Sequence, residues 1–325
     1  MKEIGGYLEF ENLAGKEYYP DLMKLNLGRT AAVYFLSGAG CSTVYVPDFL
    51  CASVTDALRK AGFRLIFYRI RDDFRPDCSS LPDVPGLSEN EWLYVVNAYG
   101  QLTDGDFLSL KKKYGNVLAD YTHAFFQHPL PGIPTLYSVR KFFGVTDGAY
   151  LSSDRDLPEI PGRDFSNMRF AHILGRYEED AGSHYRQMLD NAHSYEQEDI
   201  KRMSALTQNL LGGFDYGAIA GKRLKNYQLL SARLSSSNPL ASFLRTPDGG
   251  PFAYPYYTED GITARKKLAE MKIFVPTNWS NVIMEAEKSS AAYRCAANIL
   301  CLPCDQRYDG ADMEAVADAV LSLHE

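Results

Sequence analysis

Residues 28–155 alternate between short stretches rich in Val, Ile, Leu and Tyr and longer stretches with the pattern of helices. This alternation constrains the fold more than any other feature of the chain. The strand-like stretches are 42–47, 63–70, 91–99, 116–121, 135–139 and 148–153. The helix-like stretches are 29–40, 53–62 and 106–115, and each ends at a glycine, as helices often do. Short strands that alternate with helices predict a three-layer α/β fold, in which a mainly parallel sheet is covered on both faces.

The rest of the chain predicts two further regions. Residues 164–240 are polar and helical, and a smaller α+β unit follows them. A length of 325 residues suits about two domains. We therefore predict a large domain at residues 1–185, a helical linker at 186–245 and a small C-terminal α+β domain at 246–325. In an alternative arrangement, residues 1–20 pack on the small domain.

Charge and hydropathy argue against two classes of protein. The chain carries 34 basic and 41 acidic side chains, a net charge of −7, whereas proteins that bind the backbone of nucleic acids usually carry a basic field. No apolar run approaches the ~20 residues that a bilayer requires, and the first residues lack the apolar core of a signal peptide. We expect a cytoplasmic protein that binds neither nucleic acid nor membranes.

The six cysteines predict neither a disulfide framework nor a metal site in a chain of this length. Cys301 and Cys304 have the spacing of half a zinc site, but no second pair of Cys or His stands at a suitable distance. Because the pair follows an apolar run, we predict that it closes a strand.

Polar residues follow the predicted strands at the points where a ligand is expected, since open α/β sheets bind ligands beyond the carboxyl ends of their strands. Asp120 closes one strand and is followed by His123. Ser138 ends the next strand, and Lys141 comes three residues later. The neighbours of Lys141 are apolar, although lysine is seldom fully buried. Its position is therefore the one that most needs an explanation.

These residue types are the ones that a pyridoxal phosphate (PLP) site requires. A lysine forms a Schiff base with the aldehyde of PLP, and a carboxylate keeps the pyridine nitrogen protonated so that the ring can accept electrons. Hydroxyl groups and the N–H groups of a helix N-terminus hold the phosphate. Gly28, Arg29 and Thr30 stand at such a helix start. An anion there would offset the unfavourable interaction of the Arg29 charge with the helix dipole.

Each of these residues also has an interpretation without a ligand. Lys141 could extend its ammonium group to solvent along its apolar stem, and Asp120 could cap a turn. His123 could be a satisfied polar residue at a strand end, and Arg29 could pair with an acid. The order of the residues along the chain favours the PLP site.

Several stretches resemble one family, the DegT/StrS sugar aminotransferases, which are fold type I PLP-dependent enzymes. The similar stretches are GRTAAVYFL (28–36), VYVPDFLCASVTDALRKAG (44–62), LADYTHAF (118–125), YSVRKFFGVTDGAYL (137–151), KRMSALTQNLLGGFDYGAIAGKRLKNYQLLSARL (201–234) and LCLPCDQRYDGADMEAVADAV (300–320). They extend over nearly the whole chain, which resembles a divergent and short member of the family.

The resemblance implies a homodimeric PLP-dependent aminotransferase with its sites near the subunit interface. It would act on an amino donor and a small carbonyl substrate, with a nucleotide-linked keto sugar as one candidate. Lys141 would form the Schiff base and move protons. Asp120 would pair with the ring nitrogen, and His123 would stand near the phenolic oxygen of the ring or near the substrate.

The remaining cofactor contacts are also implied by the resemblance. Thr30, Ala31 and Ser138 would hold the phosphate, with Arg29 beside them. Cys51 stands where the family has an aromatic side chain that stacks on the cofactor ring. The three-residue interval from Ser138 to Lys141 is shorter than the usual interval in the family.

Three other functions stay open at this point. The same site could catalyse a dehydration or lyase reaction, with His123 directing the chemistry, or it could bind PLP with little turnover. A plain α/β domain without cofactor, such as an oxidoreductase domain, is less favoured because no G-x-G-x-x-G follows the first strand.

Overall fold

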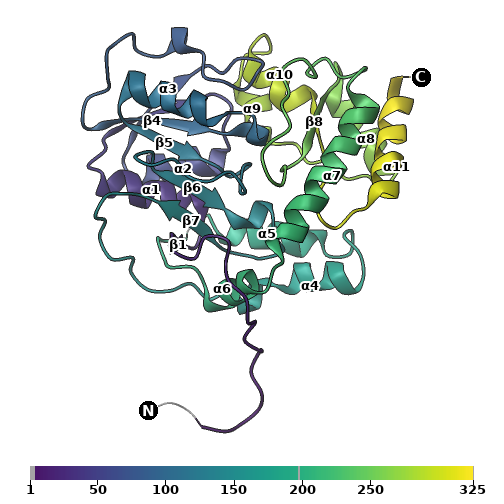
Figure 1. Cartoon of the computed structure of the whole chain (residues 1–325), viewed down its shortest axis with the longest axis horizontal. Helices are drawn as coiled ribbons and strands as arrows, with labels where there is room; N and C mark the ends of the chain where they lie inside the picture. The colour runs from purple at the N-terminus through teal and green to yellow at the C-terminus, as the bar shows by residue number, and fades with distance from the viewer. Residues whose placement is uncertain (1–3, 197, 325) are drawn as a thin grey trace.

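The computed structural model describes residues 4–196 and 198–324, and its largest element is a seven-stranded sheet surrounded by helices (Figure 1). The strand order is β1-β7-β6-β5-β4-β2-β3. Strands β2 to β6 are parallel to one another, whereas β7 runs antiparallel to both β6 and β1. The predicted mainly parallel α/β sheet is therefore confirmed. Residues 1–3, which belong to the predicted large domain, lie outside the described residues.

The elements predicted within residues 28–155 occur in the predicted order, and β1 is an additional strand. The strands are β1 (Met23–Leu25), β2 (Thr43–Pro47), β3 (Arg64–Tyr68), β4 (Glu91–Val96), β5 (Val117–Asp120), β6 (Thr135–Ser138), β7 (Ala149–Ser152), β8 (Tyr254–Tyr257) and β9 (Ile299–Leu302). The α-helices are α1 (Gly28–Gly38), α2 (Ala52–Lys60), α3 (Asp104–Tyr114), α4 (Ala171–Glu178), α5 (Tyr185–Ser194), α6 (Ala205–Gly212), α7 (Tyr216–Leu234), α8 (Gly261–Glu270), α9 (Ser280–Glu285), α10 (Ala291–Asn298) and α11 (Gly310–Leu321). A short 3-10 helix, η3 (Val139–Lys141), follows β6.

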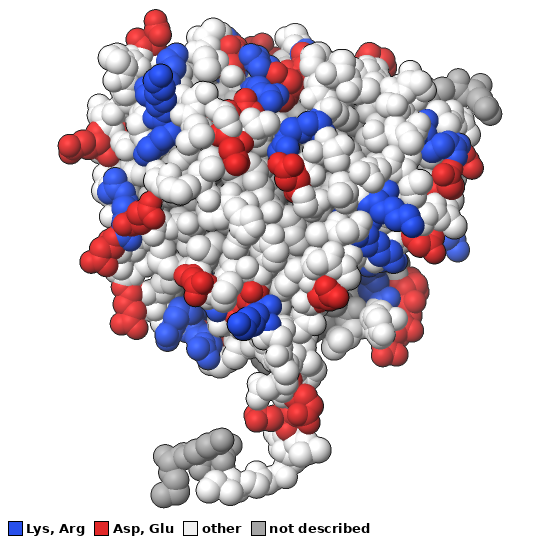
Figure 2. Space-filling model, in the orientation of Figure 1, with Lys and Arg blue, Asp and Glu red and all other residues white. Residues whose placement is uncertain are grey.

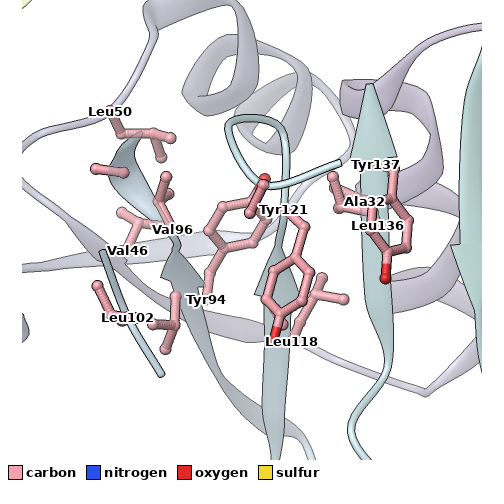
Figure 3. Packing of buried hydrophobic residues seen from close by; sticks show 14 of the residues in the cluster. Ala32, Val46, Leu50, Tyr94, Val96, Leu102, Leu118, Tyr121, Leu136 and Tyr137 are labelled. Atoms are coloured by element: carbon pink, nitrogen blue, oxygen red, sulfur yellow. The ribbon is translucent and has the colours of Figure 1, made fainter. Parts of the chain in front are cut away.

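The central strands are buried on both faces, which explains why their sequences are apolar runs rather than alternating patterns. Every residue of β2 and β5 is buried. Figure 3 shows Tyr94 on β4, Tyr137 on β6 and Tyr121 directly after β5, with Leu118 and Ala32 among the side chains packed around them. Packing on both faces therefore fixes the positions of the central strands and of the residues at their carboxyl ends.

The turn from β6 to β7 carries Lys141 and depends on one glycine. Gly148 has a φ of +116°, and a Cβ built on it would lie 2.5 Å from Val139 Cγ2. The backbone N–H of Val139 donates to the carbonyl of Gly148 at 3.2 Å. A side chain at position 148 would therefore push the 3-10 helix η3 out of place, because both the backbone conformation and the space require glycine.

A second, smaller core lies beyond the linker helices. β8 and β9 form a two-stranded antiparallel sheet, and α7, α8 and α11 pack around it (Figure 1). Cys301 lies in β9 and Cys304 just beyond its end, and both are buried, so the prediction that this pair closes a strand is confirmed. The domain boundaries at residues 185 and 245 stay a prediction.

The N-terminal segment extends away from the body of the molecule (Figure 1). The N–H of Leu13 donates to Asn209 Oδ1 at 2.8 Å, and Asn209 Nδ2 donates to the carbonyl of Glu11 at 2.8 Å. This part of the segment therefore lies along α6 rather than on the small domain. None of the described helices is long and apolar enough to cross a membrane.

Arg223 joins the linker helix α7 to both neighbouring parts of the chain. Its side chain is buried, and it donates to the carbonyl of Phe142 at 3.0 Å, the carbonyl of Pro251 at 2.9 Å and Gln306 Oε1 at 2.7 Å. Gln306 Nε2 also donates to the carbonyl of Phe142, at 2.9 Å. The residue that follows Lys141 is therefore held by two donors from the other half of the chain.

We expect Arg223→Met to lower the free energy of unfolding by about 2–4 kcal/mol, because it leaves buried acceptors without their donor. Chemical denaturation measures this change. Arg233→Met is the control, since Arg233 lies on the same helix and pairs with Glu314 and Asp318 at the surface, where a pair contributes at most about 1 kcal/mol. Equal decreases in the free energy of unfolding of the two variants would show that the buried contacts of Arg223 contribute no more than a surface ion pair.

Candidate active site

The carboxyl edge of the large sheet brings three of the predicted residues together. Asp120 ends β5, Ser138 ends the adjacent strand β6, and Lys141 ends η3. The N-terminus of α1 reaches the same place, because a Cβ built on Gly28 would lie 3.5 Å from Ser138 Cβ and 4.0 Å from Thr122 Oγ1. A carboxylate, a hydroxyl, an amine and a helix N-terminus thus share one edge of the sheet, as the sequence predicts.

Asp120 is buried and fixed by two hydrogen bonds. Its Oδ2 accepts from the Tyr94 hydroxyl at 2.7 Å, and its Oδ1 accepts from the N–H of Thr122 at 2.8 Å. Burial raises the pKa of Asp120, while hydrogen bonds from Thr122 and Tyr94 and the charge of Lys141 act in the opposite direction. Two oxygens offer about four acceptor positions, so the carboxylate can accept another donor. Tyr94 carried no signal in the sequence, because it stands inside an apolar strand.

Lys141 ends η3 at this edge of the sheet. Its side chain is exposed, although Val139 and Phe142 beside it are buried. No hydrogen bond or ion pair joins its ammonium group to another described residue. Desolvation by the surrounding protein atoms lowers the pKa of Lys141 most, and the charge of Arg140 lowers it further. Interactions with Cys51 and Asp120 raise it. The amine is therefore free to react and close to the carboxylate that the prediction requires.

His123 is buried with one ring nitrogen unsatisfied. The ring lies parallel to those of Phe252 (centroids 3.9 Å apart) and Trp279 (5.4 Å). Its Nδ1 accepts a long hydrogen bond of 3.5 Å from the N–H of Tyr99, and its Nε2 has no partner in the described chain. Burial, and then the charge of Lys141, lower the pKa of His123 well below its usual value. The ring is therefore neutral, and the proton belongs on Nε2, where it can be donated.

Phe252 and Trp279 are residues that sequence reasoning missed. They come from the C-terminal region, more than 100 residues after His123, so nothing in the local pattern indicated their contact with it. Cys51, predicted to occupy the position of the ring-stacking aromatic, is half-buried at the N-cap of α2, with its Sγ 3.1 Å from Ser53 Oγ. Its contact with a cofactor ring stays a prediction.

The start of α1 is built differently from the sequence prediction. The hydroxyl of Thr30 donates to Asn26 Oδ1 at 2.7 Å, and Ala31 donates its N–H to the carbonyl of Leu27 at 3.0 Å. Both groups therefore already have partners within the helix start. The N–H groups of residues 28–30 are the ones that an α-helix leaves free at its first turn. A phosphate contact at Thr30 or Ala31 stays a prediction, and the geometry favours the backbone of residues 28–30.

Two arginines beside the site have no acidic partner. Within residues 4–196 and 198–324, no carboxylate forms an ion pair with Arg29 or Arg140. Burial lowers the pKa of both guanidinium groups, and the charge of Arg29 lowers that of Arg140 further. Arg140 lies over the ring of Tyr195, with its Cζ 4.5 Å from the ring centroid. The sequence drew attention to Arg29 but gave Arg140 no role.

These residues fit the cofactor that the resemblance implies. The site offers an unpaired amine at Lys141, a buried carboxylate at Asp120 and a neutral donor without an acceptor at His123 Nε2. It also offers unpaired cations and free N–H groups for a dianionic phosphate. Each group that PLP would present, an aldehyde, a ring nitrogen, a phenolic oxygen and a phosphate, therefore has a partner of suitable chemistry.

Comparison with solved structures supports the same fold. The sugar aminotransferase CalS13 from Micromonospora echinospora is 15% identical, with a TM-score of 0.63 over 93% of this chain and 87% of its own. A DegT/DnrJ/EryC1/StrS aminotransferase from Brucella abortus is 9% identical, with a TM-score of 0.61 over 93% and 86%. A Streptococcus pneumoniae protein in its PLP form is 14% identical, with a TM-score of 0.66 over 93% and 86%. No family model and no curated protein matches the chain.

Proposed function

We propose that this chain, which has the fold of the fold type I PLP-dependent aminotransferases, is itself a PLP-dependent aminotransferase. The observation that carries the proposal is the free amine of Lys141 beside the buried carboxylate of Asp120 at the carboxyl edge of the sheet. The acceptor is a carbonyl compound. A nucleotide-linked keto sugar is the favoured candidate, because proteins named as sugar aminotransferases share the fold along nearly the whole chain.

Six residues would hold the cofactor. Lys141 would bond covalently to its aldehyde carbon, and Asp120 would accept a hydrogen bond from its ring nitrogen. The backbone N–H groups of residues 28–30, the hydroxyl of Ser138 and the guanidinium group of Arg29 would hold its phosphate. When bound, PLP supplies an electron-poor ring that accepts the electron pair of a bond broken at the substrate carbon.

The residues of the chain do the remaining work. Because the pKa of Lys141 is lowered, a larger share of its amine is neutral near pH 7 than for an ordinary lysine, and its Nζ can take and return a proton as a general base. The negative charge of Asp120 would keep a proton on the ring nitrogen of the cofactor. His123 donates its Nε2–H to an oxygen of the ring or of the substrate, which completes its hydrogen bonding.

We also propose that the protein is a cytoplasmic homodimer. Helix α4 and the segment before it expose large apolar side chains at Phe165, Met168, Leu174 and Tyr177. This surface lies near the site, since a Cβ built on Gly144, three residues beyond Lys141, would lie 3.7 Å from Ile173 Cγ2 on α4. A second copy that covered it would bury the apolar side chains and shield the exposed Lys141 from bulk water.

The proposed reaction is tested by a half-reaction of the purified, PLP-loaded protein with glutamate. We expect the absorbance of the PLP form to fall while that of the pyridoxamine form rises, and a carbonyl acceptor to reverse the change. Borohydride treatment before the donor is added should fix one pyridoxyl group per chain and stop the conversion. Fixation without conversion would favour a PLP-binding protein of low activity. Loss of water from a keto sugar without a donor would favour the dehydratase or lyase.

A further inference from the structure

Asp120 places a carboxyl group in the interior, where a negative charge is unfavourable. Figure 2 shows acidic side chains on the surface of the molecule, where water stabilises their charge. Asp120 instead ends the buried strand β5 and is only 4% exposed. Burial raises the pKa of Asp120, and a carboxyl group that has taken up a proton no longer holds one on a ring nitrogen opposite it. The proposed site therefore requires a contact that keeps this carboxylate ionised.

The hydroxyl of Tyr94 reaches this carboxylate from the neighbouring strand. β4 and β5 pair in parallel, with Val96 opposite Asp120. Because side chains alternate along a strand, Tyr94 lies on the same face as Val96 and therefore diagonally behind Asp120. The tyrosine ring spans this diagonal, and its hydroxyl donates to Asp120 Oδ2 at 2.7 Å. A phenylalanine would fill the same space without donating.

Tyr94 acts on Asp120 as a donor only. Its side chain is fully buried, and burial, followed by the charge of Asp120, raises the pKa of Tyr94 well above its usual value. The hydroxyl therefore keeps its proton. Its backbone carbonyl accepts from the hydroxyl of Tyr68 at 2.9 Å, which fixes this point of β4. A hydrogen bond to an ionised acceptor stabilises the charged form, so Tyr94 opposes the effect of burial on Asp120.

The other tyrosines of the same core bond elsewhere. Figure 3 shows Tyr121 and Tyr137 beside Tyr94. The hydroxyl of Tyr137 donates to the carbonyl of Gln127 at 2.9 Å, and that of Tyr121 accepts from Gln127 Nε2 at 3.4 Å. The contact with Asp120 therefore belongs to Tyr94 in particular and not to the aromatic core in general.

We propose that Tyr94 is a positioning residue whose hydroxyl keeps Asp120 ionised and fixed, so that the proton between Asp120 and the ring nitrogen of the cofactor stays on the nitrogen. The inference rests on the proposed PLP-dependent function, since PLP is what brings a ring nitrogen to Asp120. Without the hydroxyl, Asp120 becomes the stronger base and takes this proton, which leaves the nitrogen uncharged. An uncharged ring accepts electrons less well.

The experiment uses the full-length protein loaded with PLP whose ring nitrogen is isotopically labelled, because the NMR shift of this nitrogen reports whether it carries a proton. We expect a protonated nitrogen in the wild-type protein and a shift toward the unprotonated position in Tyr94→Phe. The glutamate half-reaction should become about 10- to 100-fold slower, which is the effect of losing one hydrogen bond to a charged group.

Infrared difference spectroscopy of the protein without PLP gives a second readout. At neutral pH, Tyr94→Phe should show the carbonyl band of a protonated carboxyl group. This band should be missing from the wild-type protein and from the double variant Tyr94→Phe/Asp120→Asn. Because phenylalanine keeps the shape of the ring, the fold should be retained, and the melting temperature of each variant checks this.

Tyr137→Phe is the matched control, because it removes a buried hydroxyl that bonds to Gln127 instead of Asp120. It should keep the wild-type nitrogen signal and rate. A Tyr94→Phe protein that holds PLP on Lys141 with the wild-type nitrogen signal overturns the role of Tyr94 alone. So do an equal shift in both variants and a wild-type protein whose ring nitrogen is unprotonated. If borohydride fixes nothing on Lys141, the proposed function fails, and the role of Tyr94 fails with it.

Discussion

Lys141→Ala is expected to abolish covalent attachment of PLP and to lower transamination at least about 1000-fold, since it removes both the nucleophile and the general base of the proposed reaction. Borohydride reduction followed by peptide mass spectrometry measures the attachment, and the glutamate half-reaction measures the activity. The fold should tolerate the change, because Lys141 is exposed and its ammonium group bonds to no other described residue.

Lys112→Ala is the matched control. Lys112 is exposed on α3, and its substitution should change neither the labelling nor the rate. A pyridoxyl group found on another lysine of the wild-type protein would contradict the assignment of Lys141. So would a Lys141→Ala protein that keeps more than a few per cent of the activity.

Asp120→Asn is expected to lower the rate about 100- to 1000-fold, the range seen when one preorganised electrostatic contact is removed from an active site. The amide cannot hold a proton on the ring nitrogen as a carboxylate does. Its shape still allows both local hydrogen bonds, because Oδ1 can accept from Thr122 and Nδ2 can donate to the oxygen of Tyr94. PLP binding measured by fluorescence should weaken far less than the rate falls.

The stability of Asp120→Asn should differ from wild type in a pH-dependent way. Burial raises the pKa of Asp120 in the folded protein, so its contribution to stability falls as pH rises from the unfolded pKa through the folded one. The variant should therefore gain stability relative to wild type at neutral pH and lose that gain in acid. A variant that unfolds more readily at pH 7 would mean that Asp120 serves mainly as a structural acceptor.

The sequence predicted the parts of this molecule that depend on local pattern. The carboxyl ends of parallel strands in an α/β sheet lie at one edge. The sequence alone therefore predicts that Asp120, Ser138 and Lys141 lie close together. Tyr94 could not be predicted, because a buried tyrosine in an apolar strand differs in no visible way from a packing residue. Phe252 and Trp279 depend on how the C-terminal region docks on the large sheet, which no local periodicity encodes.

The start of α1 shows that a group assigned to a ligand from the sequence can also have a partner within the protein. Leu27 occupies the N-cap position, and a leucine side chain cannot accept hydrogen bonds. Thr30 therefore takes over the capping work through its hydroxyl, which contacts both Asn26 and the backbone of Leu27. The helix start was predicted as a phosphate site, but the hydroxyl expected to face the ligand is used by the helix itself.

The backbone of Phe142, next to Lys141, is bonded to two side chains from later in the chain. Its carbonyl accepts from Arg223 and Gln306, and these two side chains also bond to each other. If the C-terminal region swung outward to admit a bulky sugar, it would pull directly on the backbone beside the lysine. We therefore expect substrate to bind and product to leave through local rearrangements near Phe142, rather than through a wide opening between the C-terminal region and the large sheet.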